Sequence, residues 1–201
     1  IRRHLDSGGD PLRPGDSRLV RVENRVIAAP AQSLAAAAEL AWARMPGCRV
    51  ELLGDAIEGE ARDVAADHAA RALALRAGMG PGAGPVLLLS GGELTVTIRG
   101  DGTGGPNAEY ALALALALDG APGIHAIACD TDGVDGAAEV AGALIGPDTL
   151  PRARAAGIDP AEALARNDAH GFFGAIGGRV VSGPTLTNVN DFRAILVLPG
   201  D

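Results

Sequence analysis

Apolar positions along this chain run without interruption in some stretches and alternate with polar ones in others. Residues 86–89 are all apolar, which is typical of a buried strand. Residues 94–98 alternate, with Leu94, Val96 and Ile98 on one face, as in a half-buried strand. Ser90, Gly91 and Gly92 between them predict a turn, which could be a simple hairpin. Further strands are predicted over residues 21–28, 48–53, 124–129, 179–182 and 192–198.

Ala-rich segments between these strands predict helices. Residues 107–118 are ambiguous, because their Ala-Leu repeat alternates as a strand would. Ala and Leu are nevertheless the best helix formers, and no β-branched residue is present, so a helix buried on nearly all sides is predicted there. The other predicted helices are 32–45, 58–76, 149–156, 160–166 and 170–176. Strands that alternate with helices indicate an α/β fold, with a mixed sheet flanked by helices.

A run of Gly and Pro over residues 78–84 predicts a boundary between two parts of the chain. Residues 1–80 would form a partial α/β layer, and residues 81–201 a complete α/β domain.

Charge and composition narrow the function classes. The net charge is −8 and no basic patch is visible, so nucleic acid is not an expected partner. No apolar run is long enough to cross a membrane, which predicts a soluble protein. Cys48 and Cys129 are far apart and predict reduced core thiols in a cytoplasmic protein. All 17 basic residues are Arg, so chemistry that needs a Lys must obtain it elsewhere.

The loop before the helix at 107–118 is the first candidate site. Gly102, Gly104 and Gly105 precede the helix start, where backbone N–H groups and the helix dipole can hold a phosphate or carboxylate. A flexible loop without function is the simpler alternative, because the spacing matches neither GxGxxG nor a P-loop.

A second candidate follows the predicted strand at 124–129. Asp130, Asp132 and Asp135 come at the carboxyl end of that strand, spaced by Gly. Ligands bind at this edge of open α/β sheets, and such carboxylates suit Mg²⁺. The alternative is a solvated turn in which an Asp caps the next helix.

A third candidate is the polar run before the last strand, which contains Thr185, Asn188, Asn190 and Asp191. Its polarity favours contact with a ligand, although these are also ordinary turn residues. The histidines, at 4, 68, 125 and 170, are scattered and predict surface or packing roles.

Four stretches taken together resemble one family. They are SGGE at 90–93 with the TVT strand, GDGTGGPNAE at 100–109, DTDGVDG at 130–136, and SGPTLTNVNDFRAILV at 182–197. In this order they resemble the C-terminal MOFRL domain of the glycerate 2-kinase family, also called hydroxypyruvate reductases. Residues 15–75 are similar to the last part of the family's Rossmann-like N-terminal domain.

The resemblance implies that ATP and Mg²⁺ are used to phosphorylate D-glycerate, a small hydroxy acid, at its 2-hydroxyl. It implies a cleft between the two domains, with a Lys from the N-terminal part. The expected partners are then the substrate, the rest of the N-terminal domain and a second copy in a homodimer. The implied catalytic residues are Asn107, Glu109 and Asp132; the implied nucleotide-binding residues are Ser90, Gly91, Gly92, Glu93, Gly102, Gly104, Gly105, Thr185, Asn188, Asn190 and Asp191.

One position departs from the family pattern. Pro106 stands where the family has an Arg, although Asn107 and Glu109 are kept. Pro suits the first position of a helix, so the fold tolerates it, but a clamp for an anion is lost. The role of that charge would then pass to Arg99, to Mg²⁺ or to no group at all.

Two other functions stay open. An NAD(P)H-dependent hydroxypyruvate reductase would need a GxGxxG loop after a strand, and GDGTGG has a different spacing. A non-catalytic anion-binding domain would also fit the absence of Lys and the presence of Pro106.

Overall fold

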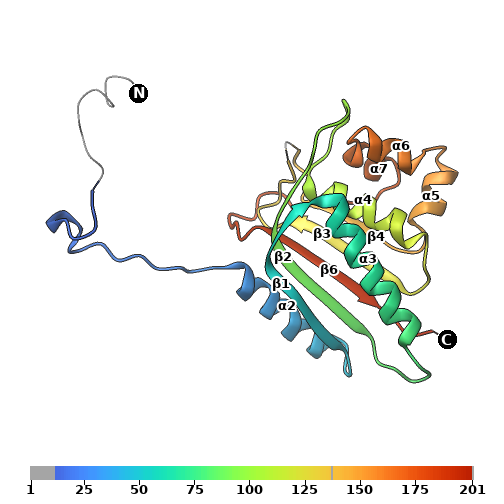
Figure 1. Ribbon diagram of the computed structural model, residues 1–201, viewed down its shortest axis with the longest axis horizontal. Helices are drawn as coiled ribbons and strands as arrows, with labels where there is room; N and C mark the ends of the chain where they lie inside the picture. The colour runs from blue at the N-terminus through green and yellow to red at the C-terminus, as the bar shows by residue number, and fades with distance from the viewer. Residues whose placement is uncertain (1–11, 137, 201) are drawn as a thin grey trace.

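The computed structural model describes residues 12–136 and 138–200, and shows a six-stranded mixed sheet flanked by helices (Figure 1). The predicted fold class is therefore confirmed. The strands are β1 (Arg49–Glu60), β2 (Val86–Thr95), β3 (Ile124–Asp130), β4 (Gly142–Ile145), β5 (Arg179–Val180) and β6 (Asp191–Val197). The helices are the 3₁₀ helix η1 (Ser17–Leu19), and α2 (Pro30–Arg44), α3 (Ala61–Gly78), α4 (Pro106–Leu118), α5 (Thr149–Ala155), α6 (Pro160–Ala165) and α7 (Ala169–Ala175).

The strand order is β1-β2-β6-β3-β4-β5. β1 and β2 are parallel, whereas β6 is antiparallel to both of its neighbours, β2 and β3. β4 is antiparallel to β3 and to β5. The carboxyl ends of β1, β2 and β3 therefore lie at the same edge of the sheet as the first residues of β4 and β6. This edge is where the predicted candidate residues come together.

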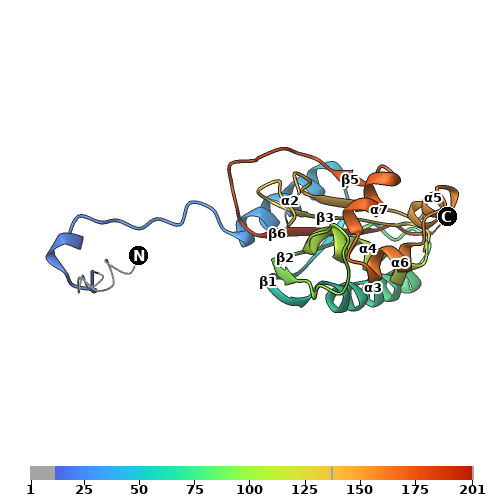
Figure 2. The same cartoon turned by 90° about the horizontal axis from the view of Figure 1, so that it is seen from above.

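Helices cover both faces of the sheet (Figure 2). On one face α3 and α4 pack on a large core that contains Leu88, Ala126 and Ile195. On the other face α2 packs on a smaller cluster in which Leu34 contacts Leu89. Neighbouring residues of β2 thus point to opposite faces, as the period of a strand requires.

Helix α4 is the central element of the larger core. It confirms the predicted helix, and it is buried along almost its whole length because α3 and the sheet enclose it. Pro106 occupies the first turn, where its missing N–H costs nothing. Asp159 also caps α6 as its sequence pattern suggests, with its side chain accepting from the N–H groups of Ala161 and Glu162.

The predicted turn at Ser90, Gly91 and Gly92 is wrong, because β2 runs straight through these residues. Gly92 has a φ of 116°, and a Cβ there would lie 2.2 Å from the backbone N of Ile57. β1 shifts its register between Gly54 and Ile57, which brings its backbone this close. The glycines are therefore needed for strand packing and not for a turn.

Other strand boundaries differ from the prediction. Residues 21–28 are extended but form no strand, and Val26 and Ile27 there are 82% and 89% exposed. This segment runs away from the sheet in Figures 1 and 2, so it has no strand to pair with among the described residues. β4 was not predicted, because it has only four residues and they show no alternation of apolar and polar side chains. The strand predicted to reach Ile98 ends at Thr95.

The Gly/Pro run at 78–84 connects α3 to β2. β1 and β2, on either side of it, are neighbours in one sheet, so the sheet continues across residue 80. The division into residues 1–80 and 81–201 stays a prediction. No helix among the described residues is long and apolar enough to cross a membrane.

Candidate functional site

Residues far apart in sequence meet at the sheet edge described above. Asp130, the last residue of β3, pairs with Asp191, the first residue of β6. Gly92 of β2 pairs with Asp191 from the other side. Three of the stretches singled out in the sequence thus lie on adjacent strands.

A buried network links this edge to α4. The Arg193 guanidinium donates to Asp191 Oδ2 over 2.7 Å and to the carbonyl of Gly91 over 2.7 Å. Asn107 Nδ2 donates to Asp191 Oδ1 over 2.7 Å. Arg193 is 1% exposed and Asp191 5%, so this ion pair is removed from water and depends on its hydrogen bonds. The network fixes the start of α4 against β2 and β6.

Asp135 caps the start of α4. Its Oδ1 accepts from the N–H of Asn107 over 2.9 Å, and its Oδ2 accepts from the N–H of Ala108 over 2.8 Å. His170 Nε2 lies 3.0 Å from the same Oδ2. A carboxylate is stable there because N–H groups and the helix dipole converge on it.

This capping corrects two expectations from the sequence. The anion predicted at the start of the helix is a carboxylate of the protein itself. Asp135, predicted as a metal ligand, has both oxygens occupied by nitrogen groups and is 1% exposed. The alternative, a solvated turn in which an Asp caps the next helix, also differs from the structure, because Asp135 is buried and caps a helix that precedes it in the chain.

The glycines of the loop before α4 have a packing role. A Cβ on Gly102 would lie 2.4 Å from Asp168 Cβ, and one on Gly105 would lie 2.4 Å from Asp135 Cγ. The N–H of Gly102 donates to the carbonyl of Arg166, and that of Thr103 to Asp168 Oδ1. The loop therefore needs glycine in order to lie against the α6–α7 connection. Nucleotide binding by Gly102, Gly104 and Gly105 stays a prediction.

Glu109 joins three elements from inside the protein. Its carboxylate accepts from Arg62 Nε over 2.6 Å and from Asn167 Nδ2 over 2.8 Å. Asn167 Oδ1 in turn accepts from the N–H groups of Arg99 and Gly100. Glu109 is 1% exposed, so this geometry supports a positioning role rather than contact with a substrate.

Asp130 and Asp132 remain partly exposed at the sheet edge. Asp130 Oδ1 accepts from the N–H of Asp132 over 2.9 Å, and Asp132 Oδ2 accepts from Asn188 Nδ2 over 3.1 Å. Burial, together with the charges of Asp132 and Asp191, raises the pKa of Asp130 to about 6. Within residues 12–136 and 138–200, no three His, Cys, Asp or Glu side chains are grouped as a complete metal site.

The polar run before β6 lies on the Asp130–Asp132 turn. Thr131 Oγ1 donates to the carbonyl of Asn190 over 2.8 Å and accepts from the N–H of Val189 over 2.9 Å. Thr185 Oγ1 donates to the carbonyl of Thr131. Two of the predicted site segments therefore form one polar surface.

Comparison with known proteins places the chain in a family. Residues 86–191, more than half of the chain, match the MOFRL family. The chain belongs to the MOFRL family.

Relatives of this MOFRL protein carry two kinds of name. A protein of Agrobacterium vitis named as a hydroxypyruvate reductase is 50% identical over 198 residues, which are 98% of this chain and 44% of the relative. The D-glycerate 2-kinase of Thermotoga maritima is 34% identical over 156 residues, 78% of this chain and 37% of the relative.

Solved structures agree with the fold. The crystal structure of the glycerate kinase of Thermotoga maritima superposes with a TM-score of 0.82 at 32% identity, covering 88% of this chain and 42% of that one. The chain thus spans less than half the length of these relatives.

All predicted site residues fall within the MOFRL match, but they differ in how far the structure exposes them. Ser90, Gly91, Gly92, Asn107 and Glu109 are buried. The exposed or partly exposed ones are Glu93, Gly102, Gly104, Asp130, Asp132, Thr185, Asn188 and Asn190.

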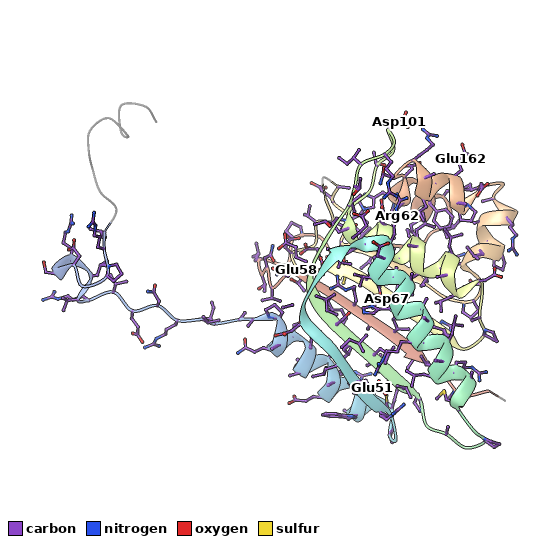
Figure 3. All side chains as sticks on the ribbon, viewed as in Figure 1. Glu51, Glu58, Arg62, Asp67, Asp101 and Glu162 are labelled. Carbon is purple, nitrogen blue, oxygen red and sulfur yellow. The ribbon has the colours of Figure 1, made fainter. Side chains whose placement is uncertain are left out.

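Sequence reasoning missed several residues of the buried networks. Arg193 lies two residues after Asp191 on the same face of β6, a spacing that could have indicated the pair. Arg62, Asn167 and His170 have no local pattern that indicates their partners, because those partners are 35 to 58 residues away. Figure 3 shows Arg62 at the start of α3. His170 and His68 are buried, and His4 lies outside the described residues.

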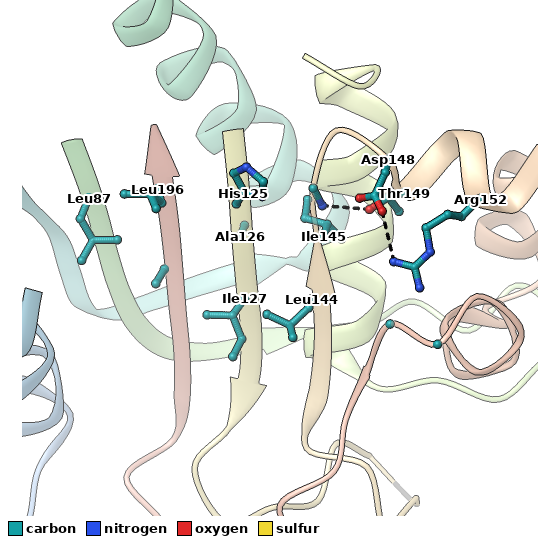
Figure 4. A pocket seen from close by; sticks show the side chains of 14 residues that line it. Leu87, His125, Ala126, Ile127, Leu144, Ile145, Asp148, Thr149, Arg152 and Leu196 are labelled. Atoms are coloured by element: carbon teal, nitrogen blue, oxygen red, sulfur yellow. Dashed lines mark hydrogen bonds and ion pairs between the residues drawn. The ribbon is translucent and has the colours of Figure 1, made fainter. Parts of the chain in front are cut away.

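The largest pocket described lies on the face of the sheet that points away from α3 and α4, towards the end of the strands that is far from the polar edge. It has a volume of about 490 Å³ and is lined mainly by apolar side chains, among them Ile127, Leu144 and Leu196 (Figure 4). Arg152 and Asp148 lie at its rim. It contains none of the predicted site residues, so it is separate from the polar edge.

Proposed function

We propose that this MOFRL protein is part of a glycerate 2-kinase, which transfers a phosphoryl group from ATP to the 2-hydroxyl of D-glycerate. The observation that carries the proposal is the polar sheet edge: the Asp130–Asp132 turn and the Thr185–Asn190 run form one surface beside the start of α4. Relatives named glycerate kinase share this part of the chain.

The residues at this edge fit Mg²⁺ in part. Asp130 and Asp132 are partly exposed carboxylates close together in sequence, and burial, together with the charges of Asp132 and Asp191, raises the pKa of Asp130. A divalent cation would relieve this repulsion, and oxygen ligands are those that Mg²⁺ prefers. Bound there, it would neutralise charge on the phosphates. The side chains of Asn188 and Asn190 would orient the ligand from the exposed run.

Positioning would be the main task of this chain, because phosphoryl transfer depends mostly on alignment and charge neutralisation. The buried Arg193–Asp191–Asn107 network and the Arg62–Glu109 pair hold the edge rigid. Asn107 and Glu109 then act on the site without touching the substrate.

The second candidate is an NAD(P)H-dependent hydroxypyruvate reductase. The name of the Agrobacterium vitis relative favours it. Against it, the loop before α4 lies on the α6–α7 connection, and the start of the helix is capped by Asp135, where a dinucleotide pyrophosphate would bind. A non-catalytic anion-binding domain is the third.

The experiment compares the three functions in one polypeptide of the length of the relatives. It is incubated with ATP, Mg²⁺ and D-glycerate, and separately with NADH and hydroxypyruvate. We expect ADP and 2-phosphoglycerate in the first and no NADH oxidation in the second. Asp132→Asn should lower the kinase rate at limiting Mg²⁺, whereas Asp67→Asn, an exposed change on α3, should not. NADH oxidation without ADP formation would establish the reductase, and no reaction in either would favour the binding domain.

A further inference from the structure

A smaller cavity lies beside the start of α4 and is distinct from the pocket on the opposite face. Its volume is about 230 Å³, and it is lined by Gly102, Thr103, Gly104, Ala138 and His170. One water occupies about 30 Å³ of liquid, so the cavity is large enough for a small organic molecule.

His170 forms one wall of this cavity and is held in a fixed orientation. Its Nε2 is bonded to the Asp135 carboxylate over 3.0 Å, and its backbone N–H donates to the carbonyl of Thr103. Arg179 donates twice to the carbonyl of His170. A carboxylate oxygen only accepts, so the Nε2 that faces Asp135 carries a proton, and in the neutral ring Nδ1 is then an acceptor.

That acceptor has no partner. His170 is 2% exposed, and its Nδ1 is buried without a hydrogen bond. A buried polar atom left unpaired is costly, so native proteins usually satisfy it with water or a ligand. Among the described residues, His170 lines the cavity together with the loop at Gly102, Thr103 and Gly104.

The same cavity offers a donor. The N–H of Gly104, which is one of the lining residues, has no hydrogen-bond partner among the described residues. The residues that line the cavity thus include one with a free acceptor and one with a free donor. An ammonium group would satisfy only the acceptor, and a carboxylate only the donor. A hydroxyl group both donates and accepts, and so matches both.

We propose that this cavity binds the hydroxyl end of a small hydroxy acid, with His170 Nδ1 accepting the hydroxyl proton in a hydrogen bond. The identity of the hydroxy acid as D-glycerate rests on the proposed kinase function. The preference for a hydroxyl rests only on the cavity. His170 is then a specificity-determining residue, positioned by Asp135.

The test uses the 201-residue chain labelled with ¹⁵N-histidine, and follows the ring nitrogens by NMR. D-glycerate should shift the Nδ1 signal of His170 saturably, because that nitrogen gains a hydrogen bond. Propionate, which has the carboxylate but no hydroxyl, should not shift it. Glycerol should produce a weaker shift in the same direction.

Two variants distinguish the effect of His170 on ligand binding from effects of a histidine substitution on folding or on the protein in general. His170→Gln keeps an N–H donor towards Asp135 but takes the acceptor away from the position of Nδ1, because its amide oxygen lies elsewhere, and should weaken D-glycerate binding about fivefold. His125→Gln changes an exposed histidine on β3 and should leave binding unchanged. Circular dichroism checks that both variants fold; the NMR titration of the unaltered chain decides the question if His170→Gln does not.

The outcomes distinguish this proposal from the kinase proposal. An Nδ1 signal that ignores D-glycerate and glycerol alike would mean that the cavity holds only water, and would overturn the cavity proposal. Equal responses to propionate and D-glycerate would overturn the hydroxyl preference. A response to glycerol in a protein of full length that forms no phosphoglycerate would support the cavity and refute the kinase.

Discussion

At the scale of single residues, Asp135 has the largest number of roles in this site. Its two oxygens accept from two backbone N–H groups of α4 and contact His170. Its charge is buried, but the helix dipole and these donors compensate for it. The sequence shows an Asp in an acidic, Gly-bent loop, which is the same pattern that a metal ligand would have.

Replacing Asp135 with Ala should therefore destabilise the chain strongly. Two buried N–H groups of α4 and His170 Nε2 would lose their partner, at a cost of about 3 kcal/mol in the free energy of unfolding. Urea denaturation measures this change. Asp67→Ala, which removes an exposed Asp from α3, is the matched control and should change stability by less than about 0.5 kcal/mol. Equal effects of the two variants would contradict the capping role.

The raised pKa of Asp130 predicts how the free energy of unfolding depends on pH. Its pKa in the folded chain is raised to about 6 from 3.8, chiefly by burial, so the folded state binds a proton more readily than the unfolded state. The contribution of this group to stability is therefore greatest below pH 4, and falls as pH rises to 6. Unfolding experiments from pH 4 to 7 should show this decline in the parent chain and a flatter profile in Asp130→Asn. An unchanged profile in the variant would assign the decline to other groups.

At the scale of elements, α3 and α4 are tied by one ion pair inside the protein. Arg62 Nε lies 2.6 Å from Glu109 Oε1, and the two side chains are 17% and 1% exposed. Arg62 also donates to the carbonyl of Leu164, which extends the tie to α6. Neither partner is near the other in sequence, so the pair appears only when the helices pack.

Removing one partner should cost more than removing both. Arg62→Ala leaves the Glu109 carboxylate buried without its cation, and should lower the free energy of unfolding by about 3 kcal/mol. Arg62→Met combined with Glu109→Gln removes both charges and keeps an acceptor for Asn167, so it should recover much of that loss. Thermal or urea unfolding of both variants checks the order. If the double variant is less stable than Arg62→Ala, the ion pair itself stabilises the protein, beyond the cost of leaving Glu109 buried without a cation.

The elements also show where local patterns predict structure well. Helix α4 could be predicted from the helix propensity of Ala and Leu, despite a strand-like alternation. Helix α6 could be predicted from the Asp-Pro pair at its start. The strand at residues 90–92 could not be predicted in this way, because two adjacent glycines are as compatible with a turn as with a strand. The register shift of β1, which decided between them, lies about 35 residues away in the sequence.

At the scale of the whole molecule, the chain presents one polar edge and spans less than half of its relatives. The carboxylates of this edge are partly exposed, and a ligand held in water there meets screened charges and loses alignment. The chain also contains no Lys to neutralise the transferred phosphoryl group.

We therefore predict that the 201-residue chain binds an anionic ligand weakly and forms no detectable phosphoglycerate. A coupled assay for ADP with ATP, Mg²⁺ and D-glycerate measures turnover, and calorimetry with the same ligands measures binding. The longer polypeptide under the same conditions is the positive control. ATP-dependent turnover by the short chain would show that an Arg in it, such as Arg99, supplies the missing charge.

The sequence by itself determined the α/β class, most helices and the order of the polar segments, since these depend on local propensity and on motifs read along the chain. It also determined that the polar segments follow strand ends. Only the tertiary structure decided what each polar residue does. Asp135 caps α4, and Asn107 and Glu109 hydrogen-bond to Asp191 and Arg62, because these partners come from distant elements that converge on α4. Whether a carboxylate meets solvent or a helix start depends on how strands pair across the sheet, and residue type alone does not set that pairing.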